Sequence, residues 1–520
     1  MDTTNKELDT ARRIVENTGM HLFLTGKAGT GKTTFLKDLK RRSSKRMIVT
    51  APTGIAAINA EGVTIHSFFQ LPFAPYIPDT VFHAGKEAYR YRFSKEKIRI
   101  IRSIDLLVID EISMVRADLL DAIDAVLRRF RAPHLPFGGV QLLMIGDLQQ
   151  LAPVVKSEEW DMLSQHYETP YFFSSRALGD TTYATIELKQ TYRQTDSRFL
   201  ELLNSIRENR PDRNTIEQLN RRHIPHFIPP PTERYIRLTT HNRQAQDINE
   251  HELRYIDKEA YVYKAEISGK FPEYSYPTDE ILTLKQGAQV MFVKNDRSTD
   301  KRYFNGMIGE ITSIDAKGFT VLSKDYPEEI RVEREQWDSS RYTLNEQTME
   351  ITEEIEGSFR QFPVRLAWAI TIHKSQGLTF SHAIIDARDS FAHGQVYVAL
   401  SRCRTLEGLV LSTPLNARTI ICDNTVERYN SLMKERIPDR QAIKEWERSY
   451  YHTLAHELFC FDQVEHSFEE TTRLLVEHFH RLYPQTLEKF NRQSPQLKER
   501  ITEVAARFGK QYTQIIAGQD

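Results

Sequence analysis

The sequence predicts an α/β fold, in which two parallel-sheet domains carry two insertions and are followed by a helical C-terminal region. Short apolar runs that end in glycine-rich or acidic turns recur in the first 150 residues, as expected for buried parallel strands. From about residue 261 to 360 the pattern changes to short strands and turns. At 520 residues the chain is also longer than one core can serve, because single cores stop growing at roughly 250–300 residues.

These changes of pattern define the expected domains. We expect a first domain over residues 1–180 with an insertion at about 70–104, and a second domain over 181–260 and 361–425. A small β-barrel over 261–360 would be inserted into the second domain, and a helical accessory domain would cover 426–520.

Composition narrows the class of protein. No run of about 18 apolar residues occurs and the N-terminus is polar, which predicts neither a membrane span nor a secretory signal. Cys403, Cys422 and Cys460 lie far apart without C-x-x-C spacing, which argues against a zinc site and against a disulfide framework and fits a reducing cytoplasm. With a net charge of −1, any binding of nucleic acid would depend on local grooves.

The first strand ends in a complete phosphate-binding pattern, G-x-x-x-x-G-K-[ST]. Glycines let the backbone bend around a polyphosphate, and the helix that follows presents the positive end of its dipole. Lys32 would reach the β- and γ-phosphates, and the Thr33 hydroxyl would hold Mg²⁺. The predicted nucleotide-binding residues are Gly26, Lys27, Ala28, Gly29, Thr30, Gly31, Lys32, Thr33 and Thr34.

Two further strands bring hydrolytic residues to the same sheet edge. The apolar run 106–109 ends in Asp110 and Glu111, at the carboxyl end where ligands of open α/β sheets bind. Asp110 is predicted to bind Mg²⁺, and Glu111 to orient and deprotonate the attacking water. The run 140–145 leads to Gln150, which is predicted to sense the γ-phosphate.

Small polar residues beyond the strands are candidates for contacts with a phosphodiester chain through hydroxyls and main-chain amides, and Phe68 is a candidate for stacking on a base. Taken singly, each of these residues more often has a structural role than a role in binding; Phe68 is also a candidate for the core, and His66 a candidate for capping a loop. The combined pattern of these residues predicts binding of nucleic acid. The candidates are Thr53, Gly54, Thr64, His66, Phe68, Thr240, Asn242, His373, Lys374 and Ser375.

The order of the motifs resembles that of superfamily-one helicases of the 5′-to-3′ group over roughly residues 8–415. The motifs are GKAGTGKT, APTG, TIHSFF, DEIS, GDLQQLAPV, LKQTYRQ, TIHKSQG and VYVALSRCR. The stretch 119–142 is similar to the signature of the Pif DNA helicases, here of the bacterial type. No motif assigns the tail, which we expect to be a docking or auxiliary DNA-binding module.

The resemblance implies two RecA-like motor domains that use ATP and Mg²⁺. Arg193 and Arg402 would reach the γ-phosphate across the cleft between the domains, with Arg404 as the competitor of Arg402. Single-stranded and forked DNA would be the partners of a bacterial, monomeric, nucleoid-associated enzyme in the cytoplasm, which translocates 5′ to 3′. The basic, aromatic segment 86–102 would grip a strand or form a wedge, or would be a solvated amphipathic helix.

One departure from the family pattern concerns the base. Residues 1–25 contain no glutamine upstream of the phosphate loop to read adenine, so Asn5 or main-chain groups would have to substitute. Two alternatives to a helicase also remain open from the sequence. They are a RecD-like motor subunit of a nuclease complex, and a nucleic-acid-stimulated ATPase switch that does not separate strands.

Overall fold

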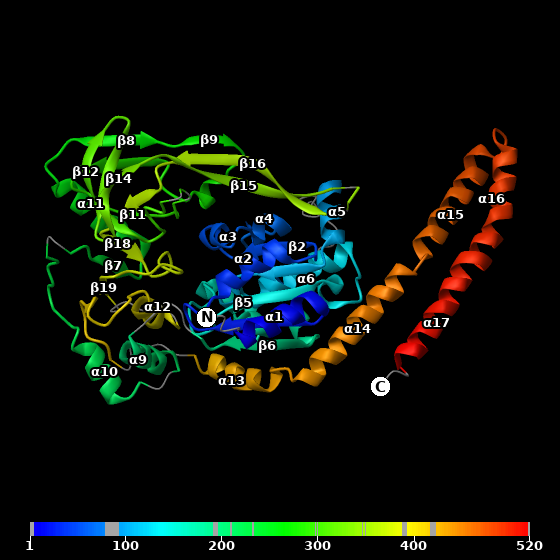
Figure 1. The fold of residues 1–520 in the computed structure, drawn as a ribbon, viewed down its shortest axis with the longest axis horizontal. Helices are drawn as coiled ribbons and strands as arrows, with labels where there is room; N and C mark the ends of the chain where they lie inside the picture. The colour runs from blue at the N-terminus through cyan, green and yellow to red at the C-terminus, as the bar shows by residue number, and fades with distance from the viewer. Residues whose placement is uncertain are drawn as a thin grey trace. The chain divides into compact units, whose positions relative to one another are not determined.

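The structure, a computed structural model, describes residues 5–78, 93–190, 196–208, 211–230, 233–296, 298, 300–345, 347–348, 350–386, 393–416 and 423–517. The chain divides into two compact units (Figure 1). The first comprises residues 1–12 and 21–437, and the second comprises residues 13–20 and 438–520. The expected combination of parallel sheets, an antiparallel region and a helical C-terminal region is confirmed.

The first domain is built on a six-stranded parallel sheet with the order β3-β2-β4-β5-β1-β6. Its central strands are fully buried and apolar, as parallel strands covered on both faces must be. The strands are β1 (His21–Gly26), β2 (Met47–Ala51), β3 (Val63–Thr64), β4 (Leu106–Ile109), β5 (Gln141–Gly146) and β6 (Tyr183–Leu188). Because β6 pairs with β1 along its whole length, the predicted domain boundary at residue 181 is wrong, and the first domain extends at least to Leu188.

Helices cover both faces of this sheet, and several begin at side-chain caps that satisfy otherwise unpaired N–H groups. The Thr53 hydroxyl accepts from Ala56 N at the start of α3, and the Ser94 hydroxyl accepts from Lys97 N at the start of α5. The helices are α1 (Lys6–Asn17), α2 (Lys32–Arg42), α3 (Gly54–Asn59), α4 (Ile65–Phe69), α5 (Lys95–Ser103), α6 (Ala117–Phe130), α7 (Ser157–Leu163) and α8 (Arg176–Gly179). Short 3₁₀ turns lie at Ile112–Met114, Pro136–Gly139 and Phe172–Ser174.

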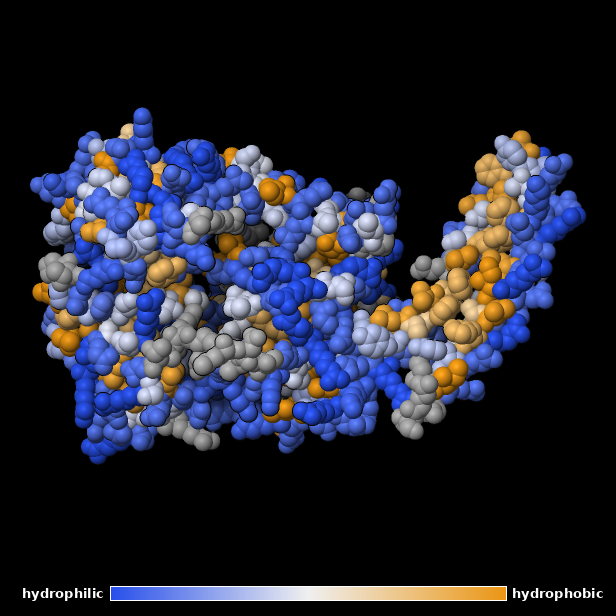
Figure 2. Space-filling model, viewed as in Figure 1, coloured by the Kyte–Doolittle hydropathy of each residue, from blue (hydrophilic) through white to orange (hydrophobic). Residues whose placement is uncertain are grey.

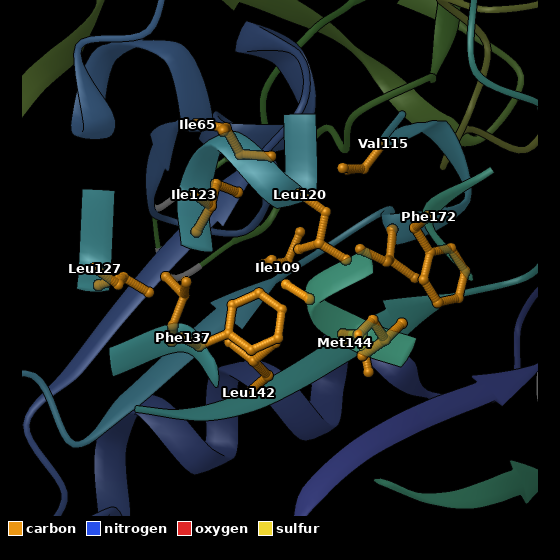
Figure 3. Packing of buried hydrophobic residues seen from close by; sticks show 14 of the residues in the cluster. Ile65, Ile109, Val115, Leu120, Ile123, Leu127, Phe137, Leu142, Met144 and Phe172 are labelled. Atoms are coloured by element: carbon orange, nitrogen blue, oxygen red, sulfur yellow. The ribbon is translucent and has the colours of Figure 1, made fainter. Parts of the chain in front are cut away.

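Apolar side chains from α4 and α6 and from β4 and β5 form the largest core cluster (Figure 3). Helix α13 (Asn424–Met433) joins this cluster through Val426, Tyr429 and Met433. The Tyr429 hydroxyl also lies 2.6 Å from the hydroxyl of Tyr183 on β6. The predicted start of the tail domain at residue 426 is therefore wrong, because α13 belongs to the core of the first domain.

The second domain has a four-stranded parallel sheet with the order β18-β7-β19-β20. Its own core cluster includes apolar residues from α9, α12 and this sheet. The elements are α9 (Ser197–Arg207), α10 (Arg213–Asn220), β7 (Ile236–Thr239), α11 (Asn242–Tyr255), β18 (Ala369–Thr371), β19 (Ala383–Ile385), α12 (Gln395–Ser401) and β20 (Leu409–Leu411).

The insertion into the second domain is antiparallel, as the short strands predict, but its described strands form three separate sheets. The five-stranded sheet β14-β13-β12-β11-β17 and the pair β10-β8 share one apolar core. The strands are β8 (Ala260–Lys264), β9 (Glu266–Gly269), β10 (Ile281–Lys285), β11 (Gln289–Phe292), β12 (Ile308–Asp315), β13 (Gly318–Ser323), β14 (Tyr326–Val332), β15 (Glu335–Leu344), β16 (Ile351–Gln361) and β17 (Val364–Leu366).

Strands β15 and β16 form a long hairpin that the sequence patterns do not indicate. The hairpin reaches the first domain, where Val49 N donates a 3.2 Å hydrogen bond to the Tyr342 hydroxyl. Lys40 of α2 pairs with Glu353 of β16 at 2.7 Å. The inserted domain is therefore not confined to the second domain but also contacts the sheet that carries the phosphate loop.

The second unit is mainly helical, with α14 (Arg440–Leu458), α15 (Asp462–Leu474), α16 (Pro484–Leu497) and α17 (Glu503–Ala517). These helices form two arms, α14 with α15 and α16 with α17 (Figure 1). Single π-helical turns lie at Leu475–Phe479, at the end of the first arm, and at Lys498–Thr502, between α16 and α17. Aromatic pairs join the arms, such as Phe459 with Phe508 at 4.8 Å between ring centroids. A band of apolar side chains runs along these helices (Figure 2). The exposed apolar side chains of this unit include Leu458 and Leu482.

Candidate functional site

The phosphate loop connects β1 to α2 in the geometry that the sequence predicts. Gly31 caps α2 in the left-handed region (φ 91°), where a glycine is favoured. A Cβ on Gly26 would lie 2.8 Å from Leu188 O of the neighbouring strand β6, so this position is sterically closed to larger residues. The Lys32 ammonium donates to the carbonyls of Gly26 and Lys27, at 2.5 and 3.0 Å.

A cavity of about 790 Å³ opens beside this loop. Residues of both parallel-sheet domains line it, because Gly377 and Arg402 of the second domain face the phosphate loop and Glu111 of the first. The lining residues are Leu8, Arg12, Ala28, Gly29, Thr30, Gly31, Lys32, Thr33, Thr34, Phe35, Asp38, Arg41, Glu111, Gln150, Gly377 and Arg402. Of the predicted nucleotide-binding residues, Gly26 and Lys27 do not line the cavity but accept from Lys32 instead.

The two acids predicted for hydrolysis follow β4. Burial raises the pKa of Asp110 to about 6, although its carboxylate accepts a 3.0 Å hydrogen bond from Glu111 N. Burial and the neighbouring charge of Asp110 raise the pKa of Glu111 to about 7. Glu111 has a left-handed backbone (φ 52°), which turns the chain sharply after the strand. A carboxylate poised near neutral pH suits a general base.

Sequence reasoning missed a direct link between the two domains at Glu111. The side-chain amide of Gln376 donates a 2.8 Å hydrogen bond to the Glu111 carboxylate. Gln376 stands in the same TIHKSQG motif as three of the predicted DNA contacts, so the motif contained the signal. A pattern cannot reveal which of its residues faces the opposite domain.

Gln150 lies at the cavity, as predicted for a sensor. Its side-chain amide donates to Asp147 at 3.2 Å, and Asp147 forms a 3.0 Å ion pair with Arg207 at the end of α9. Neither Asp147 nor Arg207 was among the predicted site residues.

The three candidate arginines differ in position. Arg402 lines the cavity with an exposed fraction of only 1%, and its Nε donates to Val398 O at 2.9 Å. Arg404 instead faces the inserted domain, 3.9 Å from Asp325. Of these two, the geometry therefore favours Arg402 as the residue that reaches a bound nucleotide. Arg193 lies outside the described residues.

Of the DNA contacts predicted in the first domain, only some have side chains that are free of the core. Thr53 and Gly54 lie at the start of α3, and the Thr64 hydroxyl caps α4 by accepting from Ser67 N. Phe68 is buried, with its ring packed edge-on against Tyr342 of the hairpin and under the Lys97 ammonium. The prediction that Phe68 stacks on a base is therefore wrong, because the ring completes the core.

An exposed aromatic ring nearby escaped the sequence analysis. Phe73 is 72% exposed, and it stacks on His66 with ring centroids 4.7 Å apart and planes 22° apart. Burial lowers the pKa of His66, which favours the neutral ring. Phe73 belongs to the same loop system as the TIHSFF motif, but a lone phenylalanine after a proline carries no pattern that would mark it.

The second group of predicted DNA contacts divides in the same way. Lys374 is exposed, His373 is half-buried, and Asn242 is exposed as the first residue of α11. Ser375 is fully buried, and its hydroxyl donates to Ile372 O at 2.7 Å, so the prediction that its side chain contacts DNA is wrong. The Thr240 hydroxyl is buried as well and lies 2.8 Å from Nδ1 of His241.

Charged residues occupy the end of the cavity that lies beyond the phosphate loop. Arg12 of α1 pairs with Asp38 of α2, and Leu8 lies beside them. Asn5, the predicted substitute for the missing glutamine, instead accepts from Leu8 N at 3.2 Å at the start of α1. Asn5 is not among the lining residues, whereas Leu8 and Arg12 are.

The described part of the chain contains neither a cluster suited to a metal ion nor a membrane-spanning helix. No cluster of three or more His, Cys, Asp or Glu residues suited to a metal ion occurs there. Among those residues, no helix is long and apolar enough to cross a membrane. Cys403 is buried and Cys460 exposed, both as free thiols, and Cys422 lies outside the described residues.

Three family models match the chain. The model described as PIF1-like helicase matches residues 4–214, and that described as UvrD-like helicase C-terminal domain matches residues 366–410. The model described as DNA helicase, middle domain, matches residues 442–520, which form most of the second unit.

Curated relatives cover most of the chain. The ATP-dependent DNA helicase Pif1 of Bdellovibrio bacteriovorus is 33% identical over 421 residues, which span 79% of this chain and 88% of that protein. The human ATP-dependent DNA helicase PIF1 is also 33% identical, over 82% of this chain and 65% of its own length.

Among solved structures, Bacteroides sp Pif1 in complex with ADP-AlF4 is similar with a TM-score of 0.76 and 41% identity, over 83% of this chain and 97% of that chain. Bacteroides Pif1 bound to ssDNA gives a TM-score of 0.60 at 41% identity, over 84% and 98%. The likeness thus covers more than four-fifths of this chain.

Proposed function

Because the chain belongs to the PIF1-like helicase family, we propose that it is an ATP-dependent helicase that translocates 5′ to 3′ on single-stranded DNA and unwinds duplex DNA. The observation that carries this proposal is the shared cavity. Its phosphate loop comes from one parallel-sheet domain, while Gly377 and Arg402 come from the other. A nucleotide between two domains can change their separation as it is bound and hydrolysed.

In the proposed reaction, Lys32 binds the β- and γ-phosphates once it exchanges its carbonyl partners for phosphate oxygens. The Thr33 hydroxyl and the Asp110 carboxylate would hold Mg²⁺, since both are oxygen donors of the kind that the ion prefers. Bound there, Mg²⁺ would neutralise phosphate charge. Glu111 orients the attacking water and accepts its proton, a role that suits a pKa of about 7.

Arg402 and Gln150 would complete the site when the domains close on the nucleotide. Arginines that reach a γ-phosphate from a second domain accelerate hydrolysis by about 10³–10⁵ and so make turnover depend on closure. The Gln376–Glu111 hydrogen bond supports the same coupling, because it ties the general base to the second domain. Arg193 is proposed as a second finger on its motif alone.

For DNA we propose contacts on both domains. Thr53, Gly54 and His66 would serve on the first domain, with Asn242, His373 and Lys374 on the second, so that alternating grip converts closure into a step. Forked DNA would be the substrate of a monomer associated with the nucleoid, and the second unit would offer a site for a protein partner. At the base end, Leu8 and Arg12 line the cavity and would contact the adenine of ATP.

The test is hydrolysis of ATP with and without single-stranded DNA. Lys32→Ala should abolish DNA-stimulated hydrolysis, because it removes the ammonium that the G-K-[ST] end of the phosphate-loop pattern supplies for the β- and γ-phosphates. Lys37→Ala is the matched control, since Lys37 lies on the same helix, is partly exposed and pairs with Glu61 at 3.1 Å. Normal turnover in Lys32→Ala would overturn the assignment of the site.

A further inference from the structure

A buried ion pair joins the second domain to the loop behind the phosphate site. The Arg207 guanidinium, at the end of α9, contacts both carboxylate oxygens of Asp147, at 3.0 and 3.4 Å. The exposed fractions of the two side chains are 10% and 1%. Helix α9 packs in the core of the second domain, whereas Asp147 directly follows β5 of the first.

Asp147 organises the loop that carries Gln150. One carboxylate oxygen accepts from Gln149 N and the other from the Gln150 side-chain amide, both at 3.2 Å. A carboxylate with so little contact with water requires a partner charge, because an unpaired charge in the protein interior is strongly destabilising. Arg207 supplies that charge, and Glu187 lies 3.7 Å from the other side of the guanidinium.

The same ion pair influences the phosphate loop. Burial by itself would raise the pKa of Asp147, but the charges of Arg207 and Lys32 lower it below its usual value. Burial lowers the pKa of Lys32, and the charge of Asp147 opposes this effect more than any other neighbour does. Asp147 therefore acts on both cations, and Arg207 is the one in direct contact with it.

Two further contacts hold the loop from the second domain. Nε2 of His393 lies 3.1 Å from Leu148 O. The backbone of Gly394 packs so closely on Gln150 that a Cβ there would lie 1.8 Å from Gln150 O. Among the described residues, Arg207, His393 and Gly394 thus hold the loop from Asp147 to Gln150 from the second domain, and the Arg207 contact is an ion pair.

We propose that Arg207 is a positioning residue for ATP hydrolysis. It keeps the Asp147 carboxylate from competing with phosphate for Lys32, and through Asp147 it holds the Gln150 amide at the cavity. The inference rests on the proposed function, since it concerns the same nucleotide site. It assigns Arg207 no contact with the nucleotide, because Arg207 does not line the cavity.

Charge-changing variants separate this role from a packing role. Arg207→Gln leaves a buried carboxylate that turns to Lys32, so KM for ATP should rise about tenfold or more and kcat should fall. Asp147→Asn removes the competing charge and should leave KM unchanged or lower it. The double variant Asp147→Asn/Arg207→Gln should therefore recover most of the lost affinity, while Arg207→Lys should keep part of it. Arg213→Gln is the matched control, with a side chain that is 93% exposed.

Affinity is measured directly with a fluorescent ATP analogue, alongside DNA-stimulated hydrolysis and thermal melting. Recovery of affinity in the double variant supports the proposal. An affinity as poor in the double variant as in Arg207→Gln would overturn it, and so would equal losses in Asp147→Asn and Arg207→Gln. If Arg207→Gln does not fold, the ATP affinities of the double variant and of Asp147→Asn are compared with that of the wild type. Only a packing role of the ion pair predicts that both variants bind ATP weakly, so this comparison still distinguishes the two roles. Absence of DNA-stimulated hydrolysis in the wild type would instead count against the proposed function.

Discussion

The hydrogen bond between Gln376 and Glu111 offers a specific perturbation of the coupling between the two domains. Gln376→Leu keeps much of the side-chain volume but removes the amide that donates to the Glu111 carboxylate at 2.8 Å. The general base would then lose its link to the TIHKSQG loop, which also carries the proposed DNA contacts His373 and Lys374.

The expected magnitude follows from the charge of the acceptor. A hydrogen bond to an ionised group contributes about 1.5–3 kcal/mol, which corresponds to roughly a 10- to 150-fold change in rate. We therefore expect kcat of DNA-stimulated hydrolysis to fall by about that factor, while DNA-free hydrolysis changes less. Loss of the donor also disfavours the carboxylate form, so the acidic limb of the pH profile should move to higher pH.

The assay is steady-state hydrolysis of ATP over a range of pH, with and without single-stranded DNA. Gln286→Leu is the matched control, because the Gln286 amide donates to Thr312 O in the inserted domain, at the same 2.8 Å. An unchanged ratio of DNA-stimulated to DNA-free turnover in Gln376→Leu would refute the proposed coupling through this bond. Equal losses in both variants would show that the effect is not specific to the site.

Three further outcomes are expected. The pKa of Glu111 is raised to about 7, and the charged form of this residue is the base. We therefore expect kcat of the wild type to be low below pH 7 and to rise as the pH increases through about 7. A flat profile between pH 6 and 8 would contradict this role. Phe73→Ala should weaken binding of single-stranded DNA by about 1–3 kcal/mol without lowering stability, because an exposed aromatic ring can stack on a base. Fluorescence anisotropy measures the affinity, and unchanged binding would show that Phe73 does not contact DNA. Phe68→Ala should instead lower the free energy of unfolding by about 3–5 kcal/mol, because the ring is buried in the core; urea titrations measure this change. A stable variant with impaired DNA binding would instead support the prediction that Phe68 contacts DNA.

The fold and the phosphate loop were accessible from the sequence because they depend on local chemistry. The phosphate loop needs glycines and a lysine in fixed order, and buried parallel strands need continuous apolar runs. Both requirements leave patterns within a few adjacent residues. The loop from Gly26 to Thr34 and the strands before Asp110 and Gln150 therefore appear where they were expected.

What depends on contacts between distant segments could not be predicted. The boundary after residue 180 was misplaced because β6 pairs with β1, a contact across more than 150 residues that no local pattern records. Gln376 and Arg207 acquire their roles only when a second domain meets the first. Phe68 and Ser375 carry side chains suited to nucleic acid, yet burial decides against them, and burial depends on the packed fold.

The most direct test of the central claim, that nucleotide turnover in the shared cavity drives movement along DNA, is an unwinding assay with tailed duplexes. The account predicts that ATP opens a duplex with a 5′ single-stranded tail and leaves one with only a 3′ tail paired, and that Lys32→Ala opens neither. Unwinding that requires a 3′ tail would contradict the proposed direction. DNA-stimulated hydrolysis by the wild type without opening of either duplex would contradict the claim that the cavity drives strand separation.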